Sequence, residues 1–215
     1  MPPETAESRT LSRAERKKAE LRREIIDAAF DCFSEQGYHA TGIADIAARL
    51  GIGHGTFYRY FENKRDIVEH VIDDLIERIL GALTDENAPD AVDTLEGYRV
   101  QSARISERLD QILAEDPRIP RMLFLDAPGI DKAMADRVLA FYGMANSLTA
   151  AYLAHGVELG YLHRDLDVDN TARTIVSMIV GSVIAALQDP DLDRPALSEA
   201  TLRVMYDGIA ARPDA

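Results

Sequence analysis

Apolar residues recur every three or four positions along almost the whole chain, and this spacing predicts amphipathic helices. The first apolar stripe runs from Leu21 to Phe33 and ends before Gly37. Ser12 and Glu15 precede it with capping-box spacing, a hydroxyl three residues before a carboxylate. No stretch alternates apolar and polar residues as a half-buried strand would. The predicted fold class is therefore all-α.

The same pattern predicts the later helices and their breaks. A short helix is expected over 43–50, with Thr41 as its N-cap and Gly51 as the turn that follows. A second short helix is expected over 54–60, and a long helix begins after Asn63 and continues through Ile79. Breaks that contain proline, glycine or aspartate separate the remaining helices. These are predicted over 91–115, 117–126, 131–159, 168–188 and 195–211.

The helix over 168–188 carries an unusually broad apolar stripe. Ser177, Gly181 and Ala185 form a row of small residues at four-residue spacing, and Ile184 lies beside the row. Such a row lets two helices approach closely, either inside one monomer or between two copies. A helix that is apolar on more than one side has more surface to cover than one core requires. We therefore favour a homodimer interface formed by these four residues.

Charge is distributed unevenly along the chain. The formal net charge is −13, which as an average argues against a nucleic-acid partner. Residues 1–70 carry −1 and residues 71–215 carry −12, whereas the segment Arg9–Arg23 carries a local +5. Phosphate contacts act within a Debye length of about 8 Å, so a local basic face can meet DNA while a distant acidic region stays away. A solvated helix face is the alternative interpretation of the basic run.

Cysteine content and hydropathy favour a cytoplasmic protein without a membrane partner. The single cysteine, Cys32, excludes a disulfide framework within the chain and lies beside the first apolar stripe, where we expect a small core residue. No apolar signal sequence stands at the N-terminus. The uncharged stretch Thr174–Gln188 has 15 residues and is shorter than the roughly 18–20 that a bilayer requires.

Residues 41–64, TGIADIAARLGIGHGTFYRYFENK, carry the most informative motif. A helix, a glycine-containing turn and a second short helix form a helix-turn-helix, whose second helix presents its N-terminal residues to the major groove of DNA. Phe57 and Phe61 would fix the angle between the two helices. Tyr58 and Tyr60 cannot both face inward beside these phenylalanines, which argues against an ordinary helical hairpin.

Each residue type on the outer face of the second helix suits contact with DNA. Arg59 can pair bidentately with guanine, and His54 and Thr56 can donate hydrogen bonds to base edges or phosphates. Gly55 has no side chain to hold the backbone away from the duplex. The predicted phosphate contacts are Tyr58 and Tyr60 through their hydroxyls and Lys64 through its charge.

The run from Glu24 to about Leu75 resembles the DNA-binding domain of TetR/AcrR-type regulators. It contains F-x-x-x-G-Y-x-A-T, D-I-A-x-x-L-G-I and G-T-F-Y-R-Y-F-x-N-K in that order. The resemblance covers about 50 residues; the rest of the chain fits the family only in length and helical content. It implies a homodimer of about nine helices per chain, in which the helices over 168–188 and 195–211 pair as a four-helix bundle.

Family roles carried onto matching positions make Thr41, Tyr58, Tyr60 and Lys64 phosphate contacts and place His54, Gly55, Thr56 and Arg59 at or near bases. Two positions depart from the family pattern: Gly42 replaces a common Thr or Ser, and Ala44 replaces an Arg that often reaches a base. More of the readout is therefore expected from Arg59, His54 and the basic arm at residues 9–18.

The resemblance divides the chain into four regions. These are a disordered tail over 1–11, a helix-turn-helix DNA-binding domain over 12–63, a connecting helix over 64–83, and a ligand-binding and dimerisation domain over 84–215. It also implies a small-molecule pocket in the last region, whose effector we expect to be apolar or amphipathic. The candidate lining residues are Tyr98, Ile105, Leu109, Met122, Phe124, Phe141, Tyr142 and Met144.

The sequence therefore favours a ligand-responsive transcriptional regulator, most simply a repressor, on a near-palindromic double-stranded operator. An enzyme is disfavoured because the five histidines are scattered and no nucleophile elbow, HExxH or paired-carboxylate motif occurs. The acidic run at Asp165, Asp167 and Asp169 lacks the glycine and glutamate of a calcium loop, so no metal or cofactor is predicted. A helical adaptor that binds protein instead of DNA is the remaining alternative.

Overall fold

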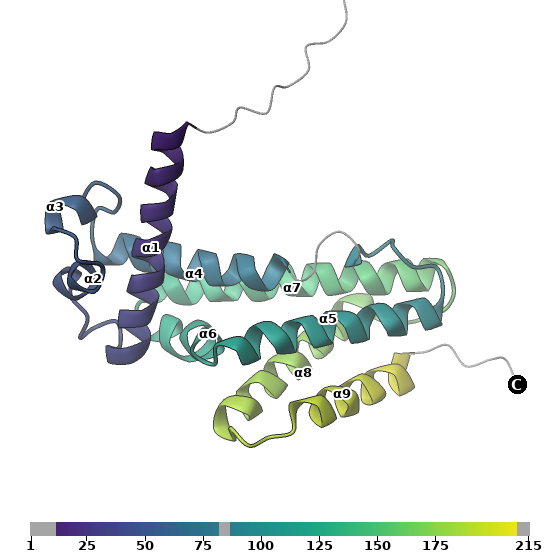
Figure 1. The fold of residues 1–215 in the computed structure, drawn as a ribbon. Helices are drawn as coiled ribbons and strands as arrows, with labels where there is room; N and C mark the ends of the chain where they lie inside the picture. Colours follow the sequence, from purple (N-terminus) through teal and green to yellow (C-terminus); the bar gives the residue numbers. More distant parts are fainter. Residues whose placement is uncertain (1–11, 82–86, 210–215) are drawn as a thin grey trace, which may run out of the picture. The chain divides into compact units, whose positions relative to one another are not determined.

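The computed structural model describes residues 12–81 and 87–209, and every regular element in these ranges is a helix (Figure 1). The all-α prediction is confirmed. The predicted tail over 1–11, residues 84–86 of the polar linker and the last two residues of the helix predicted to end at 211 lie outside the described residues. The chain divides into two compact units after Val71, within the segment predicted as the connecting helix.

The first unit begins with α1 (Arg13–Gln36), whose start and end follow the predicted signals. Ser12 Oγ accepts a hydrogen bond from the Glu15 N–H at 3.2 Å, and the Glu15 carboxylate accepts one from the Ser12 N–H at 2.8 Å. These bonds lower the pKa of the Glu15 carboxyl below its ordinary value. Gly37 ends the helix with φ at 82°, a backbone conformation that residues other than glycine rarely adopt.

The two helices of the motif are present, with two differences from the prediction. The cap of α2 (Ile43–Leu50) is Gly42 rather than Thr41, because the Asp45 carboxylate accepts the Gly42 N–H at 2.7 Å. The helix expected over 54–60 is the shorter α3 (His54–Phe57), and a turn over 58–60 follows it. The spacing of apolar residues is the same in a helix and in the turn over 58–60 that follows it, so this spacing could not locate the C-terminal end of α3.

A dense apolar core holds α1, α2 and α3 together. Phe33, Ile46, Phe57 and Phe61 are all at most 1% exposed, and the rings of Phe57 and Phe61 lie 5.8 Å apart. Cys32 is buried in the same core, as predicted. α4 (Lys64–Leu80) begins where Asn63 Oδ1 accepts the Asp66 N–H at 2.9 Å.

The second unit holds the remaining long helices, close to the predicted ranges. These are α5 (Leu95–Glu115), α7 (Lys132–Glu158), α8 (Val168–Gln188) and α9 (Arg194–Ile209). The single helix predicted over 117–126 is instead α6 (Arg118–Arg121) followed by the π-helical turn η3 (Met122–Asp126) and a short 3-10 turn, η4 (Ala127–Gly129). The period of apolar residues does not distinguish an α-turn from a π-turn over five residues.

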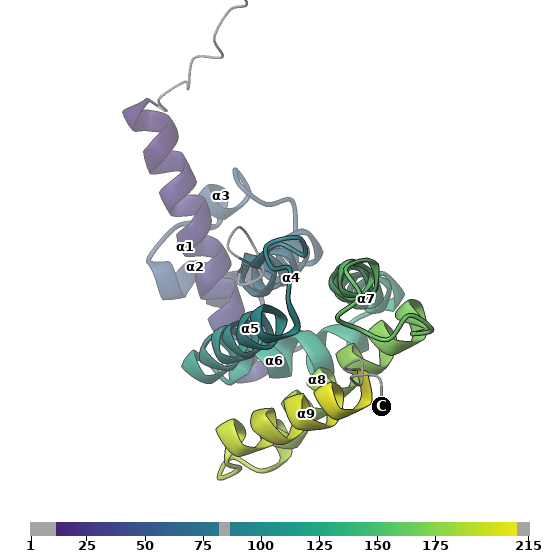
Figure 2. The same ribbon diagram turned by 90° about the vertical axis from the view of Figure 1, so that its right-hand side faces the viewer.

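Within this unit α8 packs against α7 and α9, and α9 also contacts α5 (Figures 1 and 2). The buried residues of α8 are Ala172, Ile175 and Val176. By length and composition alone α8 could cross a membrane, with a mean hydropathy of 1.4 over its most apolar 18 residues. The uncharged stretch that begins at Thr174 is shorter than the helix, which begins six residues earlier.

Candidate DNA-binding interface and ligand cavity

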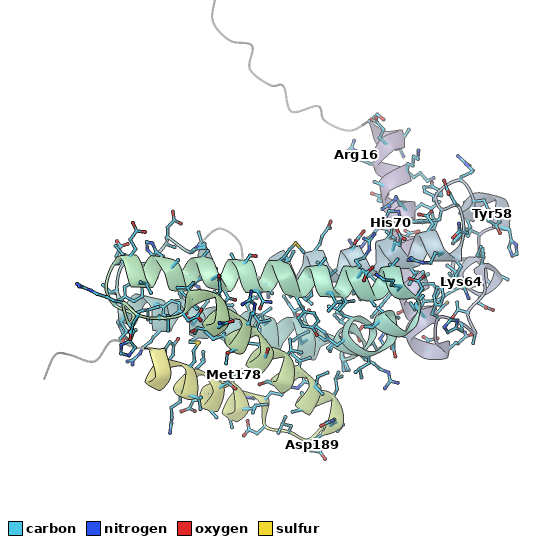
Figure 3. All side chains as sticks on the ribbon, turned by 180° about the vertical axis from the view of Figure 1, so that it is seen from behind. Arg16, Tyr58, Lys64, His70, Met178 and Asp189 are labelled. Carbon is cyan, nitrogen blue, oxygen red and sulfur yellow. The ribbon has the colours of Figure 1, made fainter. Side chains whose placement is uncertain are left out.

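The outer face of α3 and its following turn presents the residues predicted to meet DNA. His54, Gly55 and Arg59 are exposed, and the Tyr58 side chain is 55% exposed. Thr56 and Tyr60 are half-buried. Figure 3 shows Tyr58 at the outer edge of the first unit. The segment therefore projects its polar residues outward while its phenylalanines point inward.

Packing explains why Tyr58 and Arg59 face outward. Phe57 is buried, and the backbone turns so that the Phe61 N–H donates to the Phe57 carbonyl at 3.1 Å, which places both rings in the core. The Tyr58 ring lies edge-on to Phe57 with 5.7 Å between centroids, while the side chain stays 55% exposed. The aromatic core thus fixes the direction of the exposed side chains.

The Arg59 side chain forms no hydrogen bond or ion pair with any other described residue. Its guanidinium keeps five N–H donors in a planar fork, the geometry that matches the edge of a guanine. A Cβ at neighbouring Gly55 would meet no atom within 4 Å, so that position is open on its outer side.

Thr41 and Lys64 are engaged inside the protein. The Thr41 side chain is buried, and its hydroxyl donates to the carbonyls of Gly37 at 2.9 Å and Cys32 at 3.1 Å. Lys64 Nζ donates to the carbonyls of Tyr38 and Thr41, each at 2.8 Å, and lies 4.5 Å from the centre of the Tyr38 ring. Both side chains therefore hold the loop between α1 and α2 in place.

The first turns of α1 form a second basic surface. Residues 12–20 are all exposed, and α1 extends beyond α2 and α3 in both views (Figures 1 and 2). Arg16, labelled in Figure 3, lies near the free end of this helix. We refer to the exposed side chains of Arg13, Arg16, Lys17 and Lys18 as the α1 basic end.

An ion-pair cluster around Arg49 was not predicted from the sequence. The Arg49 guanidinium pairs with Glu35 at 2.6 Å and with Asp31 at 3.5 Å, which links α2 to α1. These contacts raise the pKa of Arg49 above its ordinary value. The partners are at least 14 residues apart, and no local spacing rule connects them.

The second unit contains a cavity of about 220 Å³ between α5, α7, α8 and α9. The cavity also reaches residues of α4 and η3. Its walls are mostly leucine, isoleucine, valine and aromatic side chains. Six of the eight predicted lining residues line it: Tyr98, Ile105, Leu109, Phe124, Phe141 and Tyr142.

Met122 and Met144, which were also predicted as ligand contacts, do not line this cavity. Met122 is buried at 1% exposure, while Phe124, two residues further on, reaches the cavity. Met144 is 47% exposed on the outer face of α7. The π-turn and the long uniform apolar pattern of α7 made these faces impossible to assign from spacing.

Polar groups gather in one part of the cavity lining. Ser198 Oγ of α9 donates to the Asp110 carboxylate of α5 at 2.7 Å, and Ser106 Oγ donates to Ser198 Oγ at 3.3 Å. Arg194, one turn before Ser198, also lines the cavity. Elsewhere in the lining, burial raises the pKa of the Tyr98 hydroxyl, so this group remains a protonated donor.

The four residues predicted at a dimer interface share one groove. Ser177, Gly181, Ile184 and Ala185 of α8 line it together with Tyr142 and Asn146 of α7. Gly181 is exposed, and a Cβ there would meet no atom within 4 Å. Among the described residues no group of three or more His, Cys, Asp or Glu side chains could hold a metal ion.

A helix-turn-helix unit followed by a second, helical unit is the architecture of a DNA-binding transcriptional regulator. The family of bacterial regulatory proteins named tetR matches residues 25–71. The chain is 30% identical over 135 residues to the HTH-type transcriptional repressor Rv3405c of Mycobacterium tuberculosis, covering 60% of this chain and 70% of that protein. This chain belongs to the TetR family of transcriptional regulators.

Two further comparisons extend over most of the chain. It is 25% identical over 187 residues to the fatty acid metabolism regulator protein of Bacillus subtilis, covering 86% of this chain and 94% of that protein. The structure of FadR from Bacillus subtilis in complex with stearoyl-CoA matches with a TM-score of 0.70 and 24% identity. It covers 86% of this chain and 98% of that one, and shows that the fold is shared.

Proposed function

We propose that this regulator is a cytoplasmic homodimeric repressor that binds a near-palindromic operator and leaves it when an apolar or amphipathic molecule enters the cavity. The observation that carries the proposal is the exposed Tyr58–Arg59 edge, fixed from behind by the buried Phe57 and Phe61. A dimer would place two such edges in successive major grooves, about 34–36 Å apart.

The roles of the interface residues follow from their exposure and chemistry. Arg59 reads guanine, His54 and Thr56 contact base edges or phosphates, and Gly55 lets the backbone approach the duplex. Tyr58 and Tyr60 donate to phosphates. The α1 basic end adds contacts with flanking phosphates. Thr41 and Lys64 act by holding the α1–α2 loop, since their donors are used inside the protein.

The homodimer is supported by the incomplete burial of α8. Only 11% of the residues in its most apolar stretch are buried, and Ser177 and Gly181 are exposed. A second copy that covers Ser177, Gly181, Ile184 and Ala185 would remove this apolar surface from water. Dimerisation would therefore cover the apolar face of α8 without a bilayer.

Release by a ligand follows from the cavity. A molecule that binds the conformation with low DNA affinity more tightly shifts the population toward it, and only by that difference in affinity. One relative with the same fold is described in complex with stearoyl-CoA. At 24% identity the likeness concerns the fold, so the apolar lining of the cavity in this chain carries the proposal.

Capture of genomic DNA fragments by the purified protein tests the function, followed by titration of the captured duplex at several salt concentrations. We expect a defined set of near-palindromic fragments and a linear fall of log affinity with log salt. A protein adaptor would capture no fragment reproducibly and would show no duplex binding even at low salt, which would refute the proposal. Order-of-addition transcription assays on a captured fragment then separate repression from activation.

A further inference from the structure

The polar part of the cavity restricts the head group of the molecule that the cavity accepts. Among the described residues that line the cavity, Asp110 is the one acid and Arg194 is the one base. No other described residue forms a salt bridge with either side chain. Ser198 is the one described hydrogen-bond donor to Asp110. The carboxylate therefore retains acceptor capacity beside an apolar wall.

The geometry of α5 and α9 makes this a site with a defined polarity. Ser106, Ser198 and Asp110 form a chain of hydrogen bonds in which each hydroxyl donates toward the carboxylate. Ser198 uses its proton in that chain, so the acceptor at its end is Asp110. Arg194 lies one turn from Ser198 on the same helix and supplies donors at the same part of the lining.

The rest of the lining suits an elongated apolar body. The residues of α5 that line the cavity run from Tyr98 to Leu113, about 22 Å along a helix axis. Asp110 lies near the C-terminal end of this row, close to Leu113. An occupant would therefore place a polar head near Asp110 and Arg194 and extend an apolar tail toward Tyr98.

We propose that the cavity selects amphiphiles with an uncharged head that donates a hydrogen bond to Asp110 and accepts one from Arg194. This inference rests on the proposed function of the cavity as the effector site. A carboxylate head would bring a second negative charge beside Asp110 where the lining offers a single guanidinium. An ammonium head would likewise bring a second positive charge beside Arg194. A primary amide satisfies both side chains without adding charge.

The test uses three probes with one tail and different heads: dodecanamide, dodecanoate and dodecylamine. Each displaces the neutral fluorescent probe N-phenyl-1-naphthylamine from the full-length protein, below the critical micelle concentrations. We expect dodecanamide to displace the dye at a concentration about 10-fold lower than either charged probe, the effect of one charge-assisted hydrogen bond. Equal or tighter binding of dodecanoate or dodecylamine by the wild-type protein would overturn the inference.

Two substitutions assign the preference to the named residues. Asp110→Asn keeps the size of the side chain and an acceptor for Ser198, and should bring dodecanamide and dodecanoate within about 3-fold of each other, because the repelling charge is gone. In Arg194→Gln the Asp110 charge remains, so dodecanoate should still bind more weakly than dodecanamide. An unchanged ratio in Asp110→Asn would overturn the assignment, and if that variant unfolds, the wild-type order of the three probes still decides.

A variant with a filled cavity separates this inference from the proposed function. Ala145 lines the cavity, and Ala145→Phe should abolish the dye response. No dye response in the wild type, or an unchanged response in Ala145→Phe, would refute the cavity as an effector site altogether. A dye response that only the filled variant abolishes, together with a reversed order of the probes, would refute the head-group selection alone.

Discussion

The two units of this regulator are packed differently. In the first, the large apolar side chains Phe33, Phe57, Phe61 and Ile46 are at most 1% exposed and form one core across three helices. In the second, the helices surround a cavity of about 220 Å³ and α8 leaves most of its apolar residues half-buried. The same class of amphipathic helix thus makes a filled core in one unit and an incompletely filled one in the other.

The difference matches the tasks proposed for the two units. A recognition surface needs side chains at fixed positions, and a dense core supplies them because packed interiors do not deform continuously. A unit that admits a ligand and a second copy must leave apolar surface uncovered in the isolated chain. The incomplete packing of the second unit is therefore what its proposed function requires.

The largest effect is expected from breaking the filled core. Phe57→Ala should lower the free energy of unfolding by about 3–5 kcal/mol, because it removes a fully buried ring and leaves a cavity behind it. It should also abolish DNA binding, since Tyr58 and Arg59 lose their support. Denaturant titration followed by circular dichroism measures the first effect, and duplex titration the second.

Phe141→Ala is the matched control in the second unit. Phe141 is 6% exposed but already borders the cavity, so fewer contacts are lost and the expected cost is below about 2 kcal/mol. Equal costs for the two substitutions would contradict the contrast between the units.

The next effect concerns the uncovered face of α8. Gly181→Leu should weaken the dimer by about 1–3 kcal/mol per copy, because the added side chain prevents close approach of the partner helix. The isolated chain has open space at this position, so its own fold should not suffer. Sedimentation velocity over a range of concentrations measures the change.

Gly143→Leu provides the control for that substitution. Gly143 lies in the middle of α7 and is exposed, and a Cβ added there would likewise meet no atom within 4 Å. The substitution should leave the oligomeric state unchanged. An intact dimer in Gly181→Leu would show that this face of α8 is not part of the dimer interface.

A smaller effect is expected on sequence readout. Arg59→Ala should weaken binding to the cognate operator by about 1–3 kcal/mol and relax the preference at one base pair, because a bidentate contact to guanine is lost. Lys17→Ala, in the α1 basic end, should weaken binding to all duplexes and reduce the salt slope by about one. Competition titrations with operator variants at several salt concentrations distinguish the two. Arg59→Ala with full affinity and unchanged preference would exclude Arg59 from readout.

Most of the fold could be predicted from the sequence, because it depends on local signals. The capping box at Ser12, the turn at Gly37 and the spacing of Phe57 and Phe61 each specify a short stretch of backbone, and the structure contains all of them. The long helices follow their apolar period closely. The direction in which Tyr58 and Arg59 point also follows from the neighbouring phenylalanines.

What could not be predicted depends on contacts between distant residues. The hydrogen bonds of Lys64 reach carbonyls at least 23 residues away, and those of Asp110 reach Ser198, 88 residues away. Spacing rules treat Lys64 as an exposed charge at a helix start and Asp110 as a solvated acid. Whether Met122 and Met144 face the cavity could not be predicted for a related reason, since an apolar residue on a broad stripe can pack against any of several neighbouring helices.

The smallest effect tests whether Lys64 serves the first unit by its contacts or by its charge. Lys64→Met keeps an unbranched stem against Tyr38 and removes the donors to the Tyr38 and Thr41 carbonyls. We expect it to lower the free energy of unfolding by about 1 kcal/mol, because Lys64 is only half-buried and water can replace part of what is lost. DNA binding should weaken for all sequences with an unchanged salt slope, in contrast to Lys17→Ala. A slope reduced by about one, with unfolding unaffected, would instead make Lys64 a direct phosphate contact.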